Sequence, residues 1–172
     1  DKKWWPAQLH LVGKEIIKFH CAYWPAMLLS AGLPLPRHVF AHGWLTIDGQ
    51  KMSKSIGNVI DPVKLATTYG NDVLRFYLFR DVIFGSDGDF SEVRLKERYE
   101  GELANGIGNL VARVLAMIEK YTDGRVPRTG HAPPLVSHHT FLTEYELHMA
   151  SFNLDRALNT IWEFINVLDT LI

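Results

Sequence analysis

The stretch Gly49–Asn58, GQKMSKSIGN, places two lysines three residues apart in a small, polar segment. It lies between a hydrophobic run at residues 38–47 and a sequence typical of a helix start at residues 61–70. The glycines near its two ends allow the backbone to change conformation, so the segment can move as a lid. Two mobile cationic side chains suit a polyphosphate, which they bind as point charges. A solvated surface loop has the same composition, so residue types alone leave both interpretations open.

The composition of the whole chain narrows the classes of protein that it can belong to. The chain has 172 residues, of which 47% are hydrophobic, so a packed core is expected. A net charge of −1 argues against a general electrostatic attraction to nucleic acid or to an anionic membrane. The single cysteine, Cys21, can form neither an internal disulfide nor a cysteine zinc site alone. With no membrane-length apolar run and no signal-peptide layout, we expect a cytoplasmic protein with no membrane partner.

The hydrophobic pattern changes near residue 90. Before that point, strand-like and helix-like segments alternate, as they do in an α/β layer. A buried strand is expected at residues 8–13 and a second strand at 39–47. Between them the spacing predicts a helix that Pro25 should bend or interrupt. A further helix should begin at Pro62, capped by Asp61.

After residue 90, the sequence predicts helices only. A long helix should run from Ser91 to about Tyr121, and two more should occupy about 138–150 and 153–172. Three glycines, at positions 101, 106 and 108, weaken the long helix, and either close helix packing or close approach of RNA would explain them. The chain begins with Asp1 and ends without a helix-stop signal, so we expect a piece of a longer protein.

Several polar residues outside the lysine stretch are candidates for binding, and each also has a structural interpretation. Gly13 and Glu15 follow a strand and open a helix, where ligands gather in open α/β sheets, but a turn glycine and a helix-start glutamate look the same. His20 and Trp24 are four residues apart and share a helix face, although a histidine among apolar residues is more often part of the core. Asn109 and Arg113 also share a face, which could contact RNA or simply be solvated.

The order of residues in the lysine stretch resembles a known signature. KMSKS, residues 51–55, is similar to the signature of class I aminoacyl-tRNA synthetases, and residues 12–36, VGKEIIKFHCAYWPAMLLSAGLPLP, look specifically like methionyl-tRNA synthetases. The resemblance covers nearly the whole chain. It implies ATP-dependent activation of methionine to methionyl-adenylate and transfer to tRNA(Met). Lys54 would be the main phosphate contact, Lys51 would support it, and Mg²⁺ would accompany the ATP.

The same resemblance assigns roles to the other candidates. Gly13 and Glu15 would bind the adenylate ribose, although aspartate is the more frequent acid at the second position. The methionine pocket would be lined by Phe19, His20 and Trp24. His42 and Leu45 would lie near the adenine, Leu45 through its backbone. Asn109 and Arg113 would read the anticodon.

The resemblance implies a fold and a division into domains. The expected fold is an α/β Rossmann-like half-domain followed by an all-α helical bundle. Residues 1–90 would be the second half of the catalytic domain with its connecting fold, and residues 91–172 would begin the anticodon-binding domain. The HIGH-type signature of the family has no counterpart here, so the chain alone should be inactive. Zinc is not supported within this chain, and the oligomeric state is left open.

Two alternatives remain at this stage. One is a different class I synthetase, specific for cysteine or isoleucine, because the lysine stretch is shared with those enzymes. The other is a non-catalytic tRNA-binding module derived from a synthetase.

Overall fold

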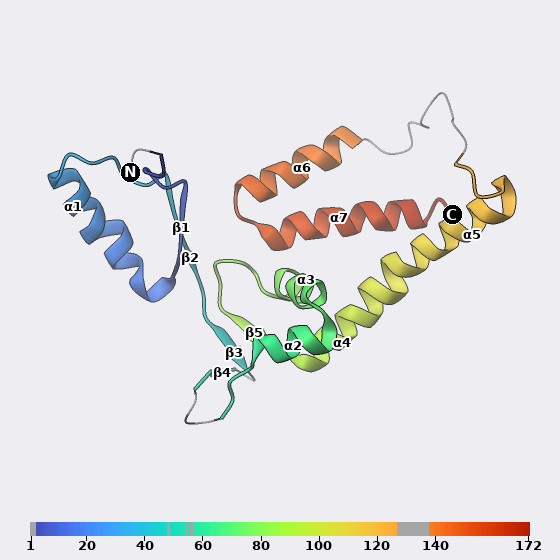
Figure 1. Cartoon of the computed structure of the whole chain (residues 1–172), viewed down its shortest axis with the longest axis horizontal. Coiled ribbons are helices and arrows are strands. Elements are labelled where there is room, and N and C mark those ends of the chain that lie inside the picture. The colour runs from blue at the N-terminus through green and yellow to red at the C-terminus, as the bar shows by residue number, and fades with distance from the viewer. Residues whose placement is uncertain (1–2, 48, 54, 56, 127–137) are drawn as a thin grey trace. The chain divides into compact units, whose positions relative to one another are not determined.

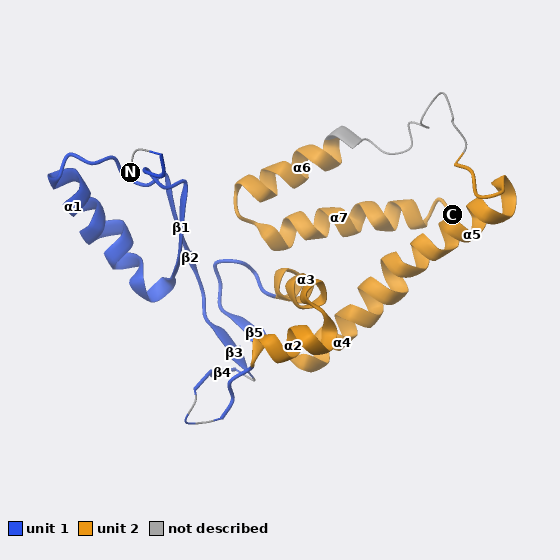
Figure 2. Cartoon of the chain, in the orientation of Figure 1, with its two compact units in different colours: residues 1–60, 82–90 blue, residues 61–81, 91–172 orange. Residues whose placement is uncertain are grey.

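The computed structural model describes residues 3–47, 49–53, 55, 57–126 and 138–172. The chain divides into two compact units (Figure 2). Unit 1 comprises residues 1–60 and 82–90, and unit 2 comprises residues 61–81 and 91–172. Together they combine small β-sheets with a larger number of helices (Figure 1). Among the described residues, no helix combines the length and the apolar character that a membrane crossing needs.

Unit 1 contains a parallel pair of strands joined by a helical crossover. Strand β1 (Leu9–Gly13) pairs in parallel with β2 (His38–His42), in the register Leu9↔His38 to Gly13↔His42. The first strand was expected to be buried, and this prediction is wrong for this chain. Only Val12 of β1 is buried, and the side chain of Leu11 is 55% exposed.

The crossover between β1 and β2 is helical but changes its winding. It consists of η1 (Lys14–Ile16), a 3₁₀ turn, then η2 (Phe19–Tyr23), a π-helical turn, and then α1 (Trp24–Ser30). The backbone N–H of Trp24 donates to the carbonyl of Phe19, five residues earlier. Pro25 has no N–H to donate to the preceding turn, so a wider turn directly before it removes the conflict. The predicted interruption at Pro25 is not found: the helix continues through Pro25, and only its winding changes directly before it.

A second small sheet of unit 1 carries the start of the lysine stretch. Its order is β4-β3-β5, with β3 (Leu45–Ile47) antiparallel to β4 (Gln50–Lys51) and parallel to β5 (Gly88–Phe90).

The single strand predicted over residues 39–47 is wrong, because the chain changes sheet at Gly43 and Trp44. A Cβ at Gly43 would lie 2.2 Å from the carbonyl oxygen of Ser86, so the close approach of two backbones requires glycine there.

Unit 2 begins with a helix whose start was predicted from the sequence. Helix α2 (Pro62–Tyr69) is capped by Asp61, whose Oδ1 accepts the backbone N–H of Val63 at 2.9 Å, which confirms the prediction. Helix α3 (Asn71–Asp81) follows directly. Its fully buried Tyr77 accepts the backbone N–H of Ser91 on its hydroxyl oxygen at 3.0 Å.

The long helix expected from Ser91 to Tyr121 is a continuous helical course with a π-helical middle. It comprises α4 (Glu92–Arg98), η3 (Tyr99–Gly108) and α5 (Asn109–Thr122). Two of its glycines have a local cause. A Cβ at Gly108 would lie 2.9 Å from the carbonyl oxygen of Leu103, and one at Gly106 would lie 3.2 Å from that of Gly101. In both cases the carbonyl belongs to the residue five positions earlier, so the wide turn itself favours glycine.

The last two helices, α6 (His138–Ala150) and α7 (Leu154–Asp169), form an antiparallel pair near the positions predicted. Aromatic rings join the helices of unit 2. The rings of Phe141 and Phe164 are stacked 4.6 Å apart, and those of Phe76 and Trp162 are 4.8 Å apart.

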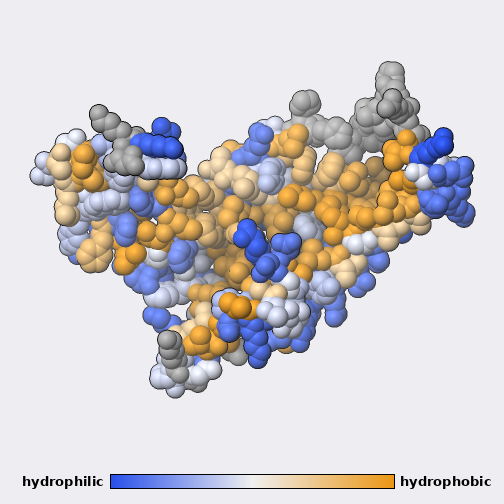
Figure 3. Space-filling model, in the orientation of Figure 1, coloured by the Kyte–Doolittle hydropathy of each residue, from blue (hydrophilic) through white to orange (hydrophobic). Residues whose placement is uncertain are grey.

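Apolar side chains also gather on the surface over α5 and α7 (Figure 3). The groove at that place is lined by Leu110, Val111, Val114, Leu115, Leu168, Leu171 and Ile172.

Candidate functional site

The lysine stretch is held at its base by one asparagine. Asn58 Oδ1 accepts the backbone N–H of Ser53 at 2.8 Å, and Asn58 Nδ2 donates to the carbonyl of Lys51 at 3.2 Å. Gly49 and Gly57 both have positive φ angles, +71° and +75°, which glycine adopts without strain. Lys51 is exposed, and its ammonium lies 3.7 Å from the ring centroid of Trp44. Lys54, the second lysine of the stretch, lies outside the described residues.

The carboxyl ends of β1 and β2 bring together three of the expected nucleotide residues. Gly13 and His42 are register partners at the last positions of the two strands. Glu15 folds back over Gly13, since a Cβ on that glycine would lie 2.6 Å from Glu15 Oε2. His42 donates from Nδ1 to the carbonyl of Gly43 at 2.9 Å. Strand ends of this kind are where open α/β sheets bind ligands.

Leu45 lies in the other sheet. It is the first residue of β3 and pairs with Gly88, so the sheet register does not place it beside Gly13 and His42.

An ion pair that the sequence analysis missed lies next to these residues. Lys14 donates to both carboxylate oxygens of Asp87, at 2.6 and 2.7 Å, and the backbone N–H of Trp44 donates to the same carboxylate at 2.8 Å. These hydrogen bonds, first from Lys14 and then from Trp44, hold the pKa of Asp87 below its ordinary value. The two partners are 73 residues apart in the sequence, so no local pattern could have indicated the contact.

Two of the three residues expected to line the amino-acid pocket are joined by ring contacts. His20 and Trp24 meet edge to face with centroids 5.9 Å apart, which confirms that they share a helix face. Two residues that the sequence analysis missed join them: His10 lies 4.8 Å from Trp24, and Trp5 lies 5.5 Å from Trp24. Phe19 instead contacts Tyr23, at 5.6 Å.

The hydrogen bonding of His20 determines what its ring can offer. Nδ1 lies 3.0 Å from the carbonyl of Ile16, an oxygen that can only accept, so Nδ1 carries the proton. In the neutral ring, Nε2 is therefore an acceptor, and it becomes a donor only in the imidazolium form. Nε2 of His10 is buried without a hydrogen-bond partner among the described residues.

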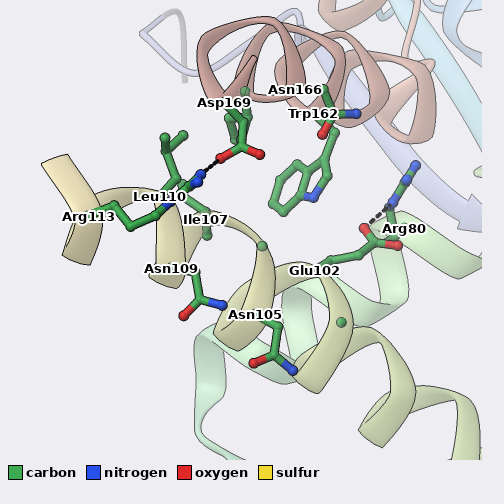
Figure 4. A pocket seen from close by; sticks show the side chains of 13 residues that line it. Arg80, Glu102, Asn105, Ile107, Asn109, Leu110, Arg113, Trp162, Asn166 and Asp169 are labelled. Carbon is green, nitrogen blue, oxygen red and sulfur yellow. Dashed lines mark hydrogen bonds and ion pairs between the residues drawn. The ribbon is translucent and has the colours of Figure 1, made fainter. Parts of the chain in front are cut away.

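Unit 2 contains a polar cavity of about 670 Å³ at the junction of η3, α5 and α7 (Figure 4). Asn109 and Arg113, singled out from the sequence, both line it. Arg113 reaches across to Asp169 on α7 and forms an ion pair with it, about half exposed. The other polar or aromatic lining residues were missed: Arg80, Glu102, Asn105, Trp162 and Asn166.

One side of the cavity is braced by a partly buried ion-pair network. Arg80 Nε lies 2.6 Å from Glu102 Oε2, and Arg98 pairs with the other oxygen of the same carboxylate. Glu102 and Arg80 are only 18% and 19% exposed. The asparagines at 105 and 109 project from the same side of the helical course, one turn apart (Figure 4). The spacing of Asn109 and Arg113 was visible in the sequence, but Asp169 of α7, which lies opposite Arg113, could not be placed from it.

The described residues contain no group of three His, Cys, Asp or Glu side chains arranged to hold a metal ion.

Comparison with known proteins gives consistent matches. The family model "tRNA synthetases class I (M)" matches residues 2–115. The methionine–tRNA ligase of Thermotoga maritima is 56% identical over 168 residues, which cover 95% of this chain and 27% of that protein. The methionine–tRNA ligase of Bacillus subtilis is 49% identical over 172 residues, covering 96% of this chain and 26% of that protein. The chain thus spans about a quarter of the length of these curated relatives.

Solved structures show the same similarity. A crystal structure of Mycobacterium tuberculosis methionyl-tRNA synthetase bound by methionyl-adenylate matches with a TM-score of 0.87 and 43% identity, over 96% of this chain and 34% of that one. The free state of the same synthetase matches with a TM-score of 0.83 and 39% identity, over 96% of this chain and 33% of that one.

Proposed function

The chain belongs to the family of class I tRNA synthetases (M), and from this premise we propose that it is part of a methionine–tRNA ligase. The observation that carries the proposal is the match, along 95% of this chain, to a protein named as that ligase. The complete enzyme would activate methionine with ATP and transfer it to tRNA(Met). We place it in the cytoplasm, as expected from the sequence.

The proposed division into domains differs from the two compact units, because residues 61–81 pack with the helical unit. The parallel pair β1–β2 with its helical crossover is the building unit of a Rossmann-like domain, and we assign residues 1–90 to the second half of such a domain. Residues 91–172 would begin a helical anticodon-binding bundle, for which the antiparallel pairing of α6 with α7 is the main support. The same division follows from the change of hydrophobic pattern near residue 90.

The first reaction would be the attack of a methionine carboxylate oxygen on the α-phosphorus of ATP. The bond from the α-phosphorus to the bridging oxygen breaks, and pyrophosphate leaves with the electron pair. Lys54 and Lys51 would neutralise the charge that develops on the phosphates, a contact that strengthens in the transition state. Gly13 and Glu15 would bind the ribose, and the proximity of Glu15 to the paired strand ends supports this role.

The adenine would lie beside His42 and the backbone of Leu45. The register pairing of His42 with Gly13 supports the first of these assignments. Mg²⁺ would arrive with ATP, because magnesium at nucleotide sites relies mainly on phosphate and water oxygens. Its chemistry would be to neutralise phosphate charge, and no residue of this chain is assigned to it.

The methionine side chain would lie against His20 and Trp24, with Phe19 at the edge of the same helical segment. Aromatic rings suit a polarizable thioether sulfur. Since the neutral His20 ring presents an acceptor at Nε2, we assign it a role in shape and packing and no hydrogen-bond donation to sulfur.

In the second reaction, a hydroxyl of the terminal tRNA ribose would attack the methionyl carbonyl, and AMP would leave. Asn109 and Arg113 would read the anticodon from the polar cavity. Their shared cavity with Trp162 supports this, since unpaired bases stack on aromatic rings and pair with amide and guanidinium groups.

Pyrophosphate exchange with the full polypeptide that contains this chain tests the proposal. Exchange should depend on methionine, and exchange that depends on cysteine or isoleucine instead would assign the chain to a different synthetase. A polypeptide that binds tRNA but shows no exchange with any amino acid would be a binding module.

The role of the lysines has its own test. Lys54→Ala should slow adenylate formation by an amount equal to about 2–4 kcal/mol of transition-state stabilisation, with little change in methionine affinity. An unchanged rate of adenylate formation would contradict the role given to Lys54.

A further inference from the structure

The contact between Lys51 and Trp44 is the least expected feature of the lysine stretch. The ammonium of Lys51 lies 3.7 Å from the ring centroid of Trp44, well within the roughly 6 Å over which a cation and an aromatic face attract each other. Among the described residues, no carboxylate lies within ion-pair distance of Lys51. The lysine is therefore oriented by a neutral partner and keeps its full charge.

The sheet register brings the two side chains together. Lys51 pairs with Thr46 across the β3–β4 hairpin, and Trp44 precedes Thr46 by two residues. Diagonal neighbours of this kind in an antiparallel pair are within reach of aromatic and long side chains. The tight turn at Gly49, whose N–H donates to Asp89 Oδ1 at 2.9 Å, fixes that register.

The backbone of Trp44 is itself held in place by hydrogen bonds to residues 87 and 88. Its backbone N–H donates to Asp87 at 2.8 Å, and its carbonyl accepts the N–H of Gly88 at 2.8 Å. Asp87 is in turn paired with Lys14. The preceding Gly43 packs directly on the backbone of Ser86. The ring thus stands on a backbone position that is fixed by hydrogen bonds to residues 87 and 88.

The backbone of Lys51 is fixed separately from its side chain. Asn58 holds the carbonyl of Lys51 and the N–H of Ser53 with one amide group. The hydrogen bonds of Asn58 therefore fix the backbone of Lys51, and the contact with Trp44 fixes the position of its ammonium group.

We propose that Trp44 is a positioning residue for Lys51, holding the ammonium over its ring until the phosphates of ATP take it over. This inference rests on the proposed function. A cation over a ring loses none of its charge and is attracted more weakly than by a phosphate, so the transfer of Lys51 to the triphosphate is favoured.

A direct measurement of the contact uses the full polypeptide with ¹³C-methylated lysines, in which the Lys51 signal is assigned with a Lys51→Met variant. The Lys51 methyl signal should be shifted upfield by the Trp44 ring, less so in Trp44→Phe, and not at all in Trp44→Leu. Trp4→Leu is the matched control, because the ammonium of Lys3 lies 4.9 Å from the ring centroid of Trp4. This substitution should leave the upfield shift of Lys51 unchanged. An upfield shift that survives in Trp44→Leu overturns the proposal.

Addition of a non-hydrolysable ATP analogue tests the transfer to phosphate. The upfield shift of Lys51 should disappear in the wild-type polypeptide, and a shift that persists with the analogue bound overturns the proposal.

Kinetics give a second readout. Trp44→Leu should lower the rate constant of methionine-dependent exchange about two- to fivefold, with the Michaelis constant for methionine unchanged. In a Lys51→Met background the same substitution should have no further effect. An equal loss in both backgrounds would show that the ring acts through something other than Lys51. If no exchange occurs with any amino acid, the proposed function fails, while the signal of Lys51 still decides whether the ring holds the lysine.

Discussion

Both compact units contain a π-helical segment beside their candidate binding residues. The two segments differ in the residue types that produce the π winding and in the contacts that hold the neighbouring residues. In unit 1, η2 directly precedes Pro25 and carries His20, whose ring packs on Trp24. In unit 2, η3 contains three glycines and leads into α5, which carries the two residues expected to contact RNA. The π winding thus has a different local cause in each unit: Pro25 lacks a backbone N–H, and the glycines of η3 lack a Cβ.

Each segment has an ion pair beside it, which we call its brace: Lys14–Asp87 in unit 1 and Arg80–Glu102 in unit 2. The two braces differ in solvent exposure. The residues around η2 are joined by aromatic rings, and the nearby Lys14–Asp87 pair is 44% and 50% exposed. The residues around η3 are joined by the Arg80–Glu102 pair, which is 19% and 18% exposed. Because removing one partner from a buried pair leaves an uncompensated charge, the brace of unit 2 should matter more to stability than that of unit 1.

The largest effect is therefore expected from Glu102. Glu102→Ala leaves the partly buried guanidinium of Arg80 without its carboxylate and should cost about 2–3 kcal/mol of unfolding free energy, measured by chemical denaturation of the full polypeptide. Glu100→Ala is the matched control on the same π segment, because Glu100 is exposed, and it should change stability by less than about 0.5 kcal/mol. Equal losses from the two substitutions would remove the distinction between the braces.

The glycines of η3 test whether the π turn is imposed by the sequence. Gly108→Ala places a Cβ 2.9 Å from the carbonyl of Leu103, so the turn must shift, at a cost of about 1–2 kcal/mol despite the better helix propensity of alanine. Gly101→Ala, whose new Cβ would meet no heavy atom within 4 Å beyond the adjacent backbone of its own helix, should instead stabilise by up to about 1 kcal/mol. Thermal or chemical denaturation of both variants measures these changes in the free energy of unfolding. A Gly108→Ala variant that is more stable than the unmodified protein would contradict the steric argument.

These two segments also show which parts of the structure the sequence could predict. Helix starts depend on neighbouring residues, so Asp61 before Pro62 was sufficient to locate α2. The face shared by His20 and Trp24 followed from a spacing of four residues. The widening of the helix into η2 and η3 was not predicted, because it depends on which carbonyl each N–H selects, and proline and glycine only indicate that a regular turn is disfavoured.

Contacts distant in the sequence account for the remaining differences. The break of the predicted strand at Gly43 depends on the backbone of Ser86, more than forty residues later. Asn109 and Arg113 could be assigned to one face from the sequence. The partner of Arg113, Asp169, could not, since nothing local indicates how α5 and α7 align. The exposure of β1 follows equally from its neighbours: in the described chain it pairs with β2 only.

Pro25 provides the corresponding test in unit 1, with a smaller expected effect. Pro25→Ala supplies an N–H that can bond to the carbonyl of Cys21, four residues earlier, so η2 should shorten toward regular α-helix. The unfolding free energy should change by less than about 1 kcal/mol. Hydrogen exchange should show a protected amide at position 25, with the protection of the Ala26 amide as the internal reference. An unprotected amide at position 25 would mean that the π turn does not depend on proline.

The smallest effect is expected from the exposed brace of unit 1, and it is best detected as a pKa. Lys14 first, and the backbone N–H of Trp44 second, hold the pKa of Asp87 below its ordinary value of 3.8. Because the native pKa is lowered, the contribution of Asp87 to stability is complete above about pH 3.8 and is lost as the pH falls through the lowered native value. In an NMR titration, Lys14→Gln should move the pKa of Asp87 back toward 3.8, and 1 M salt should do so in part, since both partners are exposed. An Asp87 carboxyl that titrates at or above 3.8 in the unmodified protein would show that Lys14 does not hold it, and the contrast between an exposed and a partly buried brace would then rest on unit 2 alone.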